Sequence, residues 1–331
     1  MTTLVTGAAG FIGFHVASEL IKSGKKVVLV DNFNSYYPTS LKLLRESVLH
    51  KEFGQEIIRL DLAEKDEVLR LFSNNSFEGV IHLAAQAGIR IPISESSLYV
   101  HSNLIGFSNL ASISAQMDLP QVIYASSSSV YGNSTPAPYR EDYLPLKPVS
   151  FYGATKLSNE ILADTIANSR NTKFTGLRFF TAYGPLGRPD MAYFRIATAL
   201  LHNQSFQLYG NGSAKRDFTY VEDIVEAIMR IYKLRLQSNG LQHEIYNIGG
   251  GAPHSILDLI EKFETISERR LTLEIKDKVA ADVEKTISDT TKLKRDTGFV
   301  PTISLDEGIS RFMEWGLQPE INNQLPLWIK N

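Results

Sequence analysis

Short apolar runs alternate with amphipathic stretches along the first half of the chain. The runs are rich in Val, Ile, Leu and Phe, and they predict β-strands at Thr2–Thr6, Lys26–Val30, Ile57–Leu60, Gly79–Leu83, Gln121–Ala125 and Phe174–Phe180. Helices are predicted between several of them, from Phe11 to Lys22 and over Glu64–Phe72. Strands that are apolar along their whole length and joined by helices are typical of a parallel sheet covered on both faces. The pattern therefore predicts an α/β fold with a doubly wound parallel sheet.

The alternation weakens after about Thr181. Two segments there, Gly184–Asp190 and Tyr209–Asp217, are rich in Gly, Pro and polar residues. Near the end of the chain, apolar spacing predicts an amphipathic helix around Leu305–Trp315. Further upstream, Thr135–Pro148 holds four prolines and reads as a surface loop, which either borders an active site or simply connects two elements.

Two parts of unequal size follow from this pattern. A helix predicted at Val221–Leu234 and a strand at Glu244–Ile248 resemble the elements of the first half. We therefore expect residues 1–180 to form the larger domain, with residues 218–248 returning to it. Residues 181–331 are expected to form mainly a smaller, mixed α/β domain.

Composition narrows the class of protein. The 331 residues carry a net charge of −2, which argues against a nucleic-acid binder. The absence of cysteine excludes disulfides, thiolate metal sites and a cysteine nucleophile. The seven histidines are scattered without a metal-binding spacing, so no metal is predicted. No apolar run approaches the ~18 residues of a membrane span, and the N-terminus lacks a basic leader. A soluble, cytoplasmic protein with no membrane partner is expected.

The first predicted strand leads into a glycine-rich turn. Gly7, Gly10 and Gly13 stand between this strand and the following helix, and Asp31 ends the next strand. Glycines at such a turn allow the backbone to approach a pyrophosphate, and the helix N-terminus offers free N–H groups to it. A carboxylate at Asp31 can accept hydrogen bonds from a ribose and would repel a 2′-phosphate. We therefore predict a Rossmann-type domain that binds NAD.

Tyr152 and Lys156 have the spacing that places two side chains on one helix face. An ammonium group near a phenol favours the phenolate, as does the charge of an oxidised nicotinamide. Such a tyrosine can serve as a general base near neutral pH.

The glycine spacing G-x-x-G-x-x-G resembles that of the extended short-chain dehydrogenases/reductases, which include the NAD-dependent epimerases and dehydratases. Segments over almost the entire chain, among them Asp31–Tyr37, Ala85–Arg90, Leu177–Pro185, Gly187–Ala192 and Lys215–Ile224, look most like the UDP-glucuronate 4-epimerases. The resemblance implies that NAD is held by Gly7, Gly10, Phe11, Ile12, Gly13, Asp31, Asn32, Asn34, Asp61, Leu62, Leu83, Ala84, Ala85, Asn103, Tyr152 and Lys156. It also implies that Ser127, which lies three residues before Val130-Tyr131-Gly132, joins Tyr152 and Lys156 as a catalytic residue.

The resemblance places the UDP-sugar against Arg90, Ser127, Ser128, Ser129, Tyr152, Thr181, Arg188 and Arg216. Arg216 matches the ligand of the diphosphate, and the alternative is a surface ion pair with Asp217 or Glu222. The residues that hold the sugar carboxylate are matched by four donors with no acid among them, Arg188, Thr181, Ser128 and Ser129. One departure is Ala281, where many relatives have glycine, and the tail after Trp315 has no recognised counterpart.

Ser128 and Ser129 replace the Asp-Glu pair of the related dehydratases, and neither titrates usefully. Elimination of water is therefore disfavoured, and simple redox chemistry or epimerisation remains as the expected reaction. The resemblance implies inversion at C4 of a UDP-hexuronic acid, UDP-glucuronate to UDP-galacturonate, through a 4-keto sugar. The alternatives are a 4-epimerase of UDP-glucose or UDP-N-acetylglucosamine and, more remotely, a non-catalytic dinucleotide-sensing regulator. Relatives are usually homodimers in which two long helices of each subunit pair. The candidate helices for this pairing are the one around Val100–Gln116 and the one beginning at Tyr152.

Overall fold

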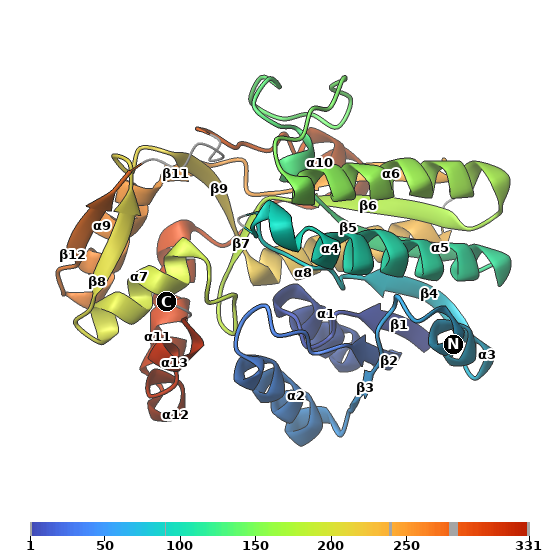
Figure 1. Cartoon of the computed structure of the whole chain (residues 1–331), viewed down its shortest axis with the longest axis horizontal. Helices are drawn as coiled ribbons and strands as arrows, with labels where there is room; N and C mark the ends of the chain where they lie inside the picture. Colours follow the sequence, from blue (N-terminus) through green and yellow to red (C-terminus); the bar gives the residue numbers. More distant parts are fainter. Residues whose placement is uncertain (1, 90, 238–239, 278–283, 330–331) are drawn as a thin grey trace.

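The larger part of the protein is built on a seven-stranded sheet, seen in the computed structural model, which describes residues 2–89, 91–237, 240–277 and 284–329 (Figure 1). Its strands are β1 (Thr2–Thr6), β2 (Lys26–Asp31), β3 (Ile57–Arg59), β4 (Phe77–His82), β5 (Gln121–Ser127), β6 (Lys173–Phe179) and β10 (His243–Ile248). Their order is β10-β6-β5-β4-β1-β2-β3, and each neighbouring pair is parallel. The order reverses beside β1, so a crevice is expected at the carboxyl ends of β1 and β4.

Side chains alternate between the two faces of this sheet and create a core on each side. Leu4 and Val80 pack with α3 (Lys65–Ser73), α5 (Phe107–Gln116) and α6 (Phe151–Ser169). The adjacent Val5 and Ile81 pack with α1 (Phe11–Lys22), α2 (Thr39–Phe53) and α8 (Val221–Gln237). Because both faces are covered, the strands are apolar along their length, as the sequence predicted.

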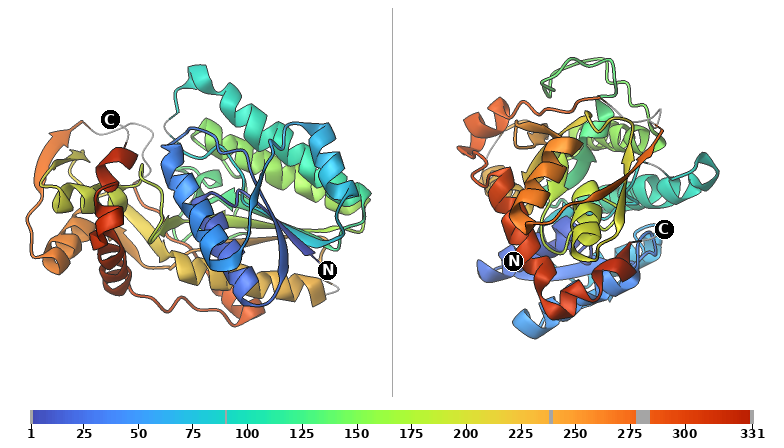
Figure 2. Two further views of the ribbon diagram at one scale, coloured as in Figure 1. Left: turned by 90° about the horizontal axis from the view of Figure 1, so that it is seen from below. Right: turned by 90° about the vertical axis from the view of Figure 1, so that its left-hand side faces the viewer.

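The smaller part lies beyond one end of the large sheet, on the left of Figure 1. A three-stranded sheet contains β7 (Thr181–Tyr183), β9 (Lys215–Tyr220) and β11 (Pro253–Ser255), and β8 (Ser205–Tyr209) pairs with β12 (Thr272–Lys276). The helices of this part are α7 (Ala192–Leu201), α9 (Ile256–Ser267), α11 (Leu305–Leu317), α12 (Pro319–Asn322) and α13 (Leu325–Trp328), whereas α10 (Thr291–Thr297) packs on α8 and β10 of the larger part. Figure 2 shows the C-terminal helices packed against this part.

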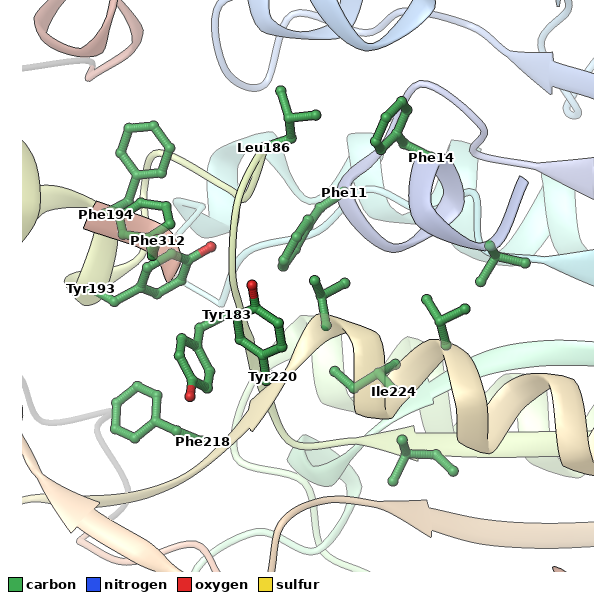
Figure 3. Packing of buried hydrophobic residues seen from close by; sticks show 14 of the residues in the cluster. Phe11, Phe14, Tyr183, Leu186, Tyr193, Phe194, Phe218, Tyr220, Ile224 and Phe312 are labelled. Atoms are coloured by element: carbon green, nitrogen blue, oxygen red, sulfur yellow. The ribbon is translucent and has the colours of Figure 1, made fainter. Parts of the chain in front are cut away.

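An aromatic cluster connects the two parts. Tyr183 lies 5.4 Å from Tyr220 between ring centres, and Phe194 lies 5.6 Å from Phe312. The cluster continues to Phe11 on α1, the helix that follows the glycine-rich turn (Figure 3). One apolar core therefore fixes the smaller part against the cofactor side of the larger one.

The structure confirms the predicted strands of the large sheet to within a few residues, and β10 pairs with β6. The predicted helix around Val100–Gln116 differs, because Val100–Gly106 is π-helical and α5 begins only at Phe107. The segment Tyr209–Asp217 is also less irregular than its composition indicated, since β9 begins at Lys215. In the part of the chain that the structure describes, no helix is long and apolar enough to cross a membrane.

Candidate active site

A cleft of about 690 Å³ opens at the carboxyl ends of the large sheet, between it and the smaller part. It is lined by almost all the residues predicted for cofactor and substrate: Gly7, Gly10, Phe11, Ile12, Gly13, Asp31, Asn32, Asn34, Asp61, Leu62, Leu83, Ala84, Ala85, Ser127, Ser128, Ser129, Tyr152, Lys156, Thr181, Arg188 and Arg216. Asn103 does not line it, and Arg90 lies outside the described residues. The Ala281 departure also lies outside them.

The glycine-rich turn is tight enough to require its glycines. Gly7 has a φ of +74°, and a Cβ added to it would lie 2.5 Å from the Ala84 backbone nitrogen. A Cβ on Gly13 would lie 2.0 Å from the Gly7 carbonyl oxygen. The first turn of α1 therefore lies directly on the loop, and its free N–H groups are available for a pyrophosphate.

Asp31 lies at the end of β2, where a ribose would reach it. Its two oxygens accept hydrogen bonds from the backbone N–H groups of Ala9 (3.1 Å) and Phe33 (2.7 Å). Each carboxylate oxygen keeps a further lone pair for a hydroxyl group. The buried Lys42 ammonium, 3.5 Å from Asp31, was not predicted, because nothing in the sequence signals that α2 turns this side chain toward the cleft.

Asn103 has a supporting position rather than a place at the cleft. Its side chain accepts a hydrogen bond from the Gln86 N–H (2.8 Å) and donates to the Gln86 carbonyl (3.1 Å) and to Thr155 (3.1 Å). The π-helical turn brings it there. Asn103 therefore links the cleft wall to α6, and its contact with the cofactor stays a prediction.

Tyr152, Lys156 and Ser127 come together at the start of α6. Ser150 caps this helix by accepting a hydrogen bond from the Gly153 N–H (3.0 Å), so Tyr152 lies in its first turn. The Lys156 ammonium lies 5.8 Å from the centre of the Tyr152 ring and donates to the Ala125 carbonyl (2.9 Å). Ser127 lines the same cleft, close enough to Tyr152 to act on its phenol.

Burial raises the pKa of the Tyr152 phenol, and the Arg188 charge and the Ser127 hydroxyl act in the opposite direction. Arg188 thus acts on the phenol in the same direction as predicted for Lys156, whose own contribution stays a prediction. Burial lowers the pKa of Lys156 to about 8.

Arg188 pairs with an acid, Asp190, which was not among the predicted site residues. Its Nε and Nη2 donate to the two oxygens of Asp190 at 3.1 and 2.6 Å, and the Tyr36 hydroxyl also donates to Asp190 (3.1 Å). The Arg188 side chain keeps 24% of its surface exposed. Asp190 thus orients the guanidinium through one edge, and the other edge remains for a ligand.

Arg216 projects from β9 into the cleft, whereas the next residue faces the other way. The Asp217 carboxylate accepts from the N–H groups of Gly250 (2.8 Å) and Ser288 (2.8 Å). Glu222, the other suggested partner, accepts from Arg311 (2.7 Å). This arrangement favours the cleft position of Arg216 over the surface ion pair.

Within the described residues, no three His, Asp or Glu side chains gather where they could hold a metal ion. The sequence did not predict the cleft-lining Trp328, which comes from the unmatched C-terminal tail and stacks on Trp315 with ring centres 6.2 Å apart.

The fold and the cleft define a dinucleotide-binding oxidoreductase-type protein with a Tyr-Lys-Ser constellation. A sequence profile of the NAD dependent epimerase/dehydratase family matches residues 3–249. The chain therefore belongs to this family.

Several relatives cover nearly the whole chain. UDP-glucuronate 4-epimerase 4 of Arabidopsis thaliana is 38% identical, over 96% of this chain and 75% of the relative. The crystal structure of UDP-glucuronic acid 4-epimerase from Bacillus cereus, in complex with UDP-glucuronic acid and NAD, is 34% identical with a TM-score of 0.87, over 95% of this chain and 98% of that one. UDP-glucose 4-epimerase from Thermotoga maritima, solved with UDP-glucose, is 30% identical with a TM-score of 0.86 at the same coverage.

Proposed function

We propose that this protein inverts C4 of a UDP-hexuronic acid, interconverting UDP-glucuronate and UDP-galacturonate with bound NAD. The observation that carries the proposal is the position of Arg188, which faces the same cleft as Tyr152 and acts electrostatically on its phenol. A cation at that point gives a sugar carboxylate a partner within reach of the reacting hydroxyl group. The Arabidopsis and Bacillus relatives, whose names give this activity, support the proposal.

The residues of the cleft fit NAD. The turn at Gly7–Gly13 leaves room for a pyrophosphate, and Asp31 retains acceptor capacity for a ribose. When bound, NAD supplies a nicotinamide ring that accepts a hydride from the sugar and returns it. Tyr152 takes the proton of the C4 hydroxyl, with Ser127 bonded to the same oxygen. Return of the hydride to the opposite face of the 4-keto sugar, with the proton passing from Tyr152 back to the C4 oxygen, inverts C4.

The 4-keto sugar of a hexuronic acid is a β-keto acid and loses carbon dioxide readily. In that side reaction the C5–C6 bond breaks, its electron pair forms an enolate with the C4 carbonyl, and water protonates C5. The bond breaks only when it is aligned with the carbonyl π system. We propose that Arg188, with Thr181, Ser128 and Ser129, holds the carboxylate out of this alignment.

The substrate is tested by incubating the purified protein with UDP-glucuronate, UDP-glucose and UDP-N-acetylglucosamine and resolving the 4-epimers by chromatography. We expect conversion of UDP-glucuronate to be the most efficient. Preferred conversion of a neutral sugar, the activity in the name of the Thermotoga relative, would reject the acidic substrate. Full activity of a Tyr152→Phe variant would reject Tyr152 as the base, and no conversion of any sugar by the wild type would favour the sensing regulator.

Replacement of Arg188 by alanine tests the role of the carboxylate. We expect turnover to fall and the decarboxylated pentose fraction to rise. The acidic limb of kcat/KM should move to higher pH, because Arg188 lowers the pKa of Tyr152. Arg140→Ala is a matched control, since Arg140 makes the same two-bond contact with Asp142 on the surface (3.1 and 2.8 Å). An Arg188→Ala enzyme with unchanged rate and product purity would contradict the assignment.

We also propose that two copies of the chain form a homodimer through α5 and α6, which lie side by side (Figure 1). Apolar side chains protrude from this region: Ile105 is 45% exposed, Phe151 40% and Ile161 61%. Phe151 and the exposed Leu162 (37%) are eleven residues apart and lie on one stripe of α6, with Ile161 beside it on the same broad face, an arrangement that suits packing against another helix.

A further inference from the structure

Arg45, on α2, is a completely buried cation whose role the sequence did not indicate. Its side chain is 0% exposed. Its hydrogen-bond partners among the described residues are all neutral: the carbonyl oxygens of Ala9 (2.8 Å), Leu186 (3.0 and 2.7 Å) and Gly187 (3.0 Å), and the Tyr37 hydroxyl (2.7 Å). Burial of a charge is costly unless many hydrogen bonds hold it. Five bonds to fixed acceptors make Arg45 a rigid connector.

The acceptors belong to two segments that are far apart in the sequence. Ala9 lies in the glycine-rich turn, and its own N–H donates to Asp31. Leu186 and Gly187 immediately precede Arg188. The guanidinium of Arg45 therefore joins the cofactor turn to the turn that carries the carboxylate-binding arginine.

The turn before Arg188 depends on such external support. Leu186 has a φ of +55°, an unfavourable backbone conformation for a residue with a side chain. A Cβ on Gly187 would lie 1.8 Å from the Tyr193 hydroxyl oxygen, so the turn lies directly on that ring. The carbonyl oxygen of Pro185, the residue before Leu186, lies 3.0 Å from Nε2 of His15 on α1. Helices α1 and α2 together bind three consecutive carbonyl groups of this turn.

We propose that Arg45 is a positioning residue for the carboxylate site: it sets the place of Arg188 relative to the cofactor turn. This proposal rests on the proposed function and deepens it. Arginine suits the task because a planar fork reaches several carbonyl groups at once, whereas a lysine ammonium presents its donors from a single point. Movement of about 1 Å at such a support is enough to change catalysis strongly.

The test compares Arg45→Lys with Arg235→Lys. Arg235 is also a buried arginine, 2% exposed, and it donates to Thr175 (3.0 Å) and to the Leu241 carbonyl (2.6 Å). Thr175 lies near the amino end of β6, away from the cleft at the carboxyl ends of the strands. Both variants keep the charge and lose the fork, so any general loss of stability appears in both.

Two measurements are made on each holoenzyme. The first gives the KM for UDP-glucuronate and the fraction of the product that is decarboxylated. Neither quantity depends on the amount of folded enzyme. For Arg45→Lys we expect both to rise, the fraction by about tenfold. The second is backbone hydrogen exchange in the peptide covering residues 184–191, which we expect to become about tenfold faster. Arg235→Lys should change neither.

Unchanged exchange and unchanged product purity in Arg45→Lys would overturn the proposal, as would equal changes in Arg235→Lys. A wild-type enzyme that leaves UDP-glucuronate unconverted would reject the proposed function instead. In that case the exchange measurement still decides whether Arg45 holds the turn.

Discussion

At the scale of single residues, two buried histidines make the stability of the folded protein depend on pH. The His82 ring is 1% exposed on β4, and its Nδ1 lies 2.7 Å from the Thr6 hydroxyl oxygen. Burial lowers the pKa of His82 to about 3 and that of His15 to about 4. Both rings are therefore neutral in the folded protein at neutral pH.

We predict that the free energy of unfolding decreases as the pH falls below about 6.5. Between that value and the folded pKa, the unfolded state binds a proton that the folded state does not, so each histidine contributes a slope of up to about 1.4 kcal/mol per pH unit. Urea unfolding at several pH values measures the slope. His82→Asn should flatten it, and His50→Asn, at an exposed position of α2, should not. An unchanged slope in His82→Asn would contradict this account.

The sequence pattern predicted the reacting side chains of the site better than the residues that hold them in place. Tyr152 and Lys156 were predictable because helix geometry alone brings them together. Lys42 and Arg45 were not, because their partners come from other segments that no local spacing relates to them. The contact of Asp190 with Arg188 has only its two-residue separation as a signal, and such pairs are common on surfaces.

At the scale of elements, the beginning of α6 determines where the phenol lies. We predict that Ser150→Ala lowers stability by about 1 kcal/mol, since a helix cap is lost. It should also reduce kcat, because Tyr152 is in the turn that Ser150 caps. Ser304→Ala is the matched control: Ser304 caps α11 by accepting from the Glu307 N–H (3.2 Å). Denaturant titration should show similar losses for both variants, and an equal kcat in the two would refute the coupling.

The elements that the sequence analysis misjudged differ from its predictions for two physical reasons. A π-helix such as Val100–Gly106 has the same apolar spacing as an α-helix over so short a stretch, and tertiary bonds of Asn103 accompany it. The large sheet was predictable because its strands are buried on both faces and therefore apolar throughout. The short strands of the smaller part are only partly buried, so their sequences carry a weaker signal.

At the scale of the whole molecule, the proposed dimer predicts that the protein in solution has the mass of two chains. Ile161→Lys places a charge on the exposed face of α6 and should convert the dimer to a monomer. Sedimentation velocity at a fixed protein concentration measures this. Ile275→Lys is the control, because Ile275 on β12 is 66% exposed and lies away from α5 and α6. A wild type that sediments as a monomer, or an Ile161→Lys variant that remains a dimer, would reject the interface.

The central claim is that one bound nicotinamide takes a hydride from C4 of UDP-glucuronate and returns it to the opposite face. The most direct measurement supplies the wild-type protein with UDP-glucuronate deuterated at C4, adds no free NAD, and analyses the product by mass spectrometry and NMR. We predict UDP-galacturonate that retains the deuterium at C4. A product that has lost the deuterium to water, or the absence of any C4 epimer, would contradict the account.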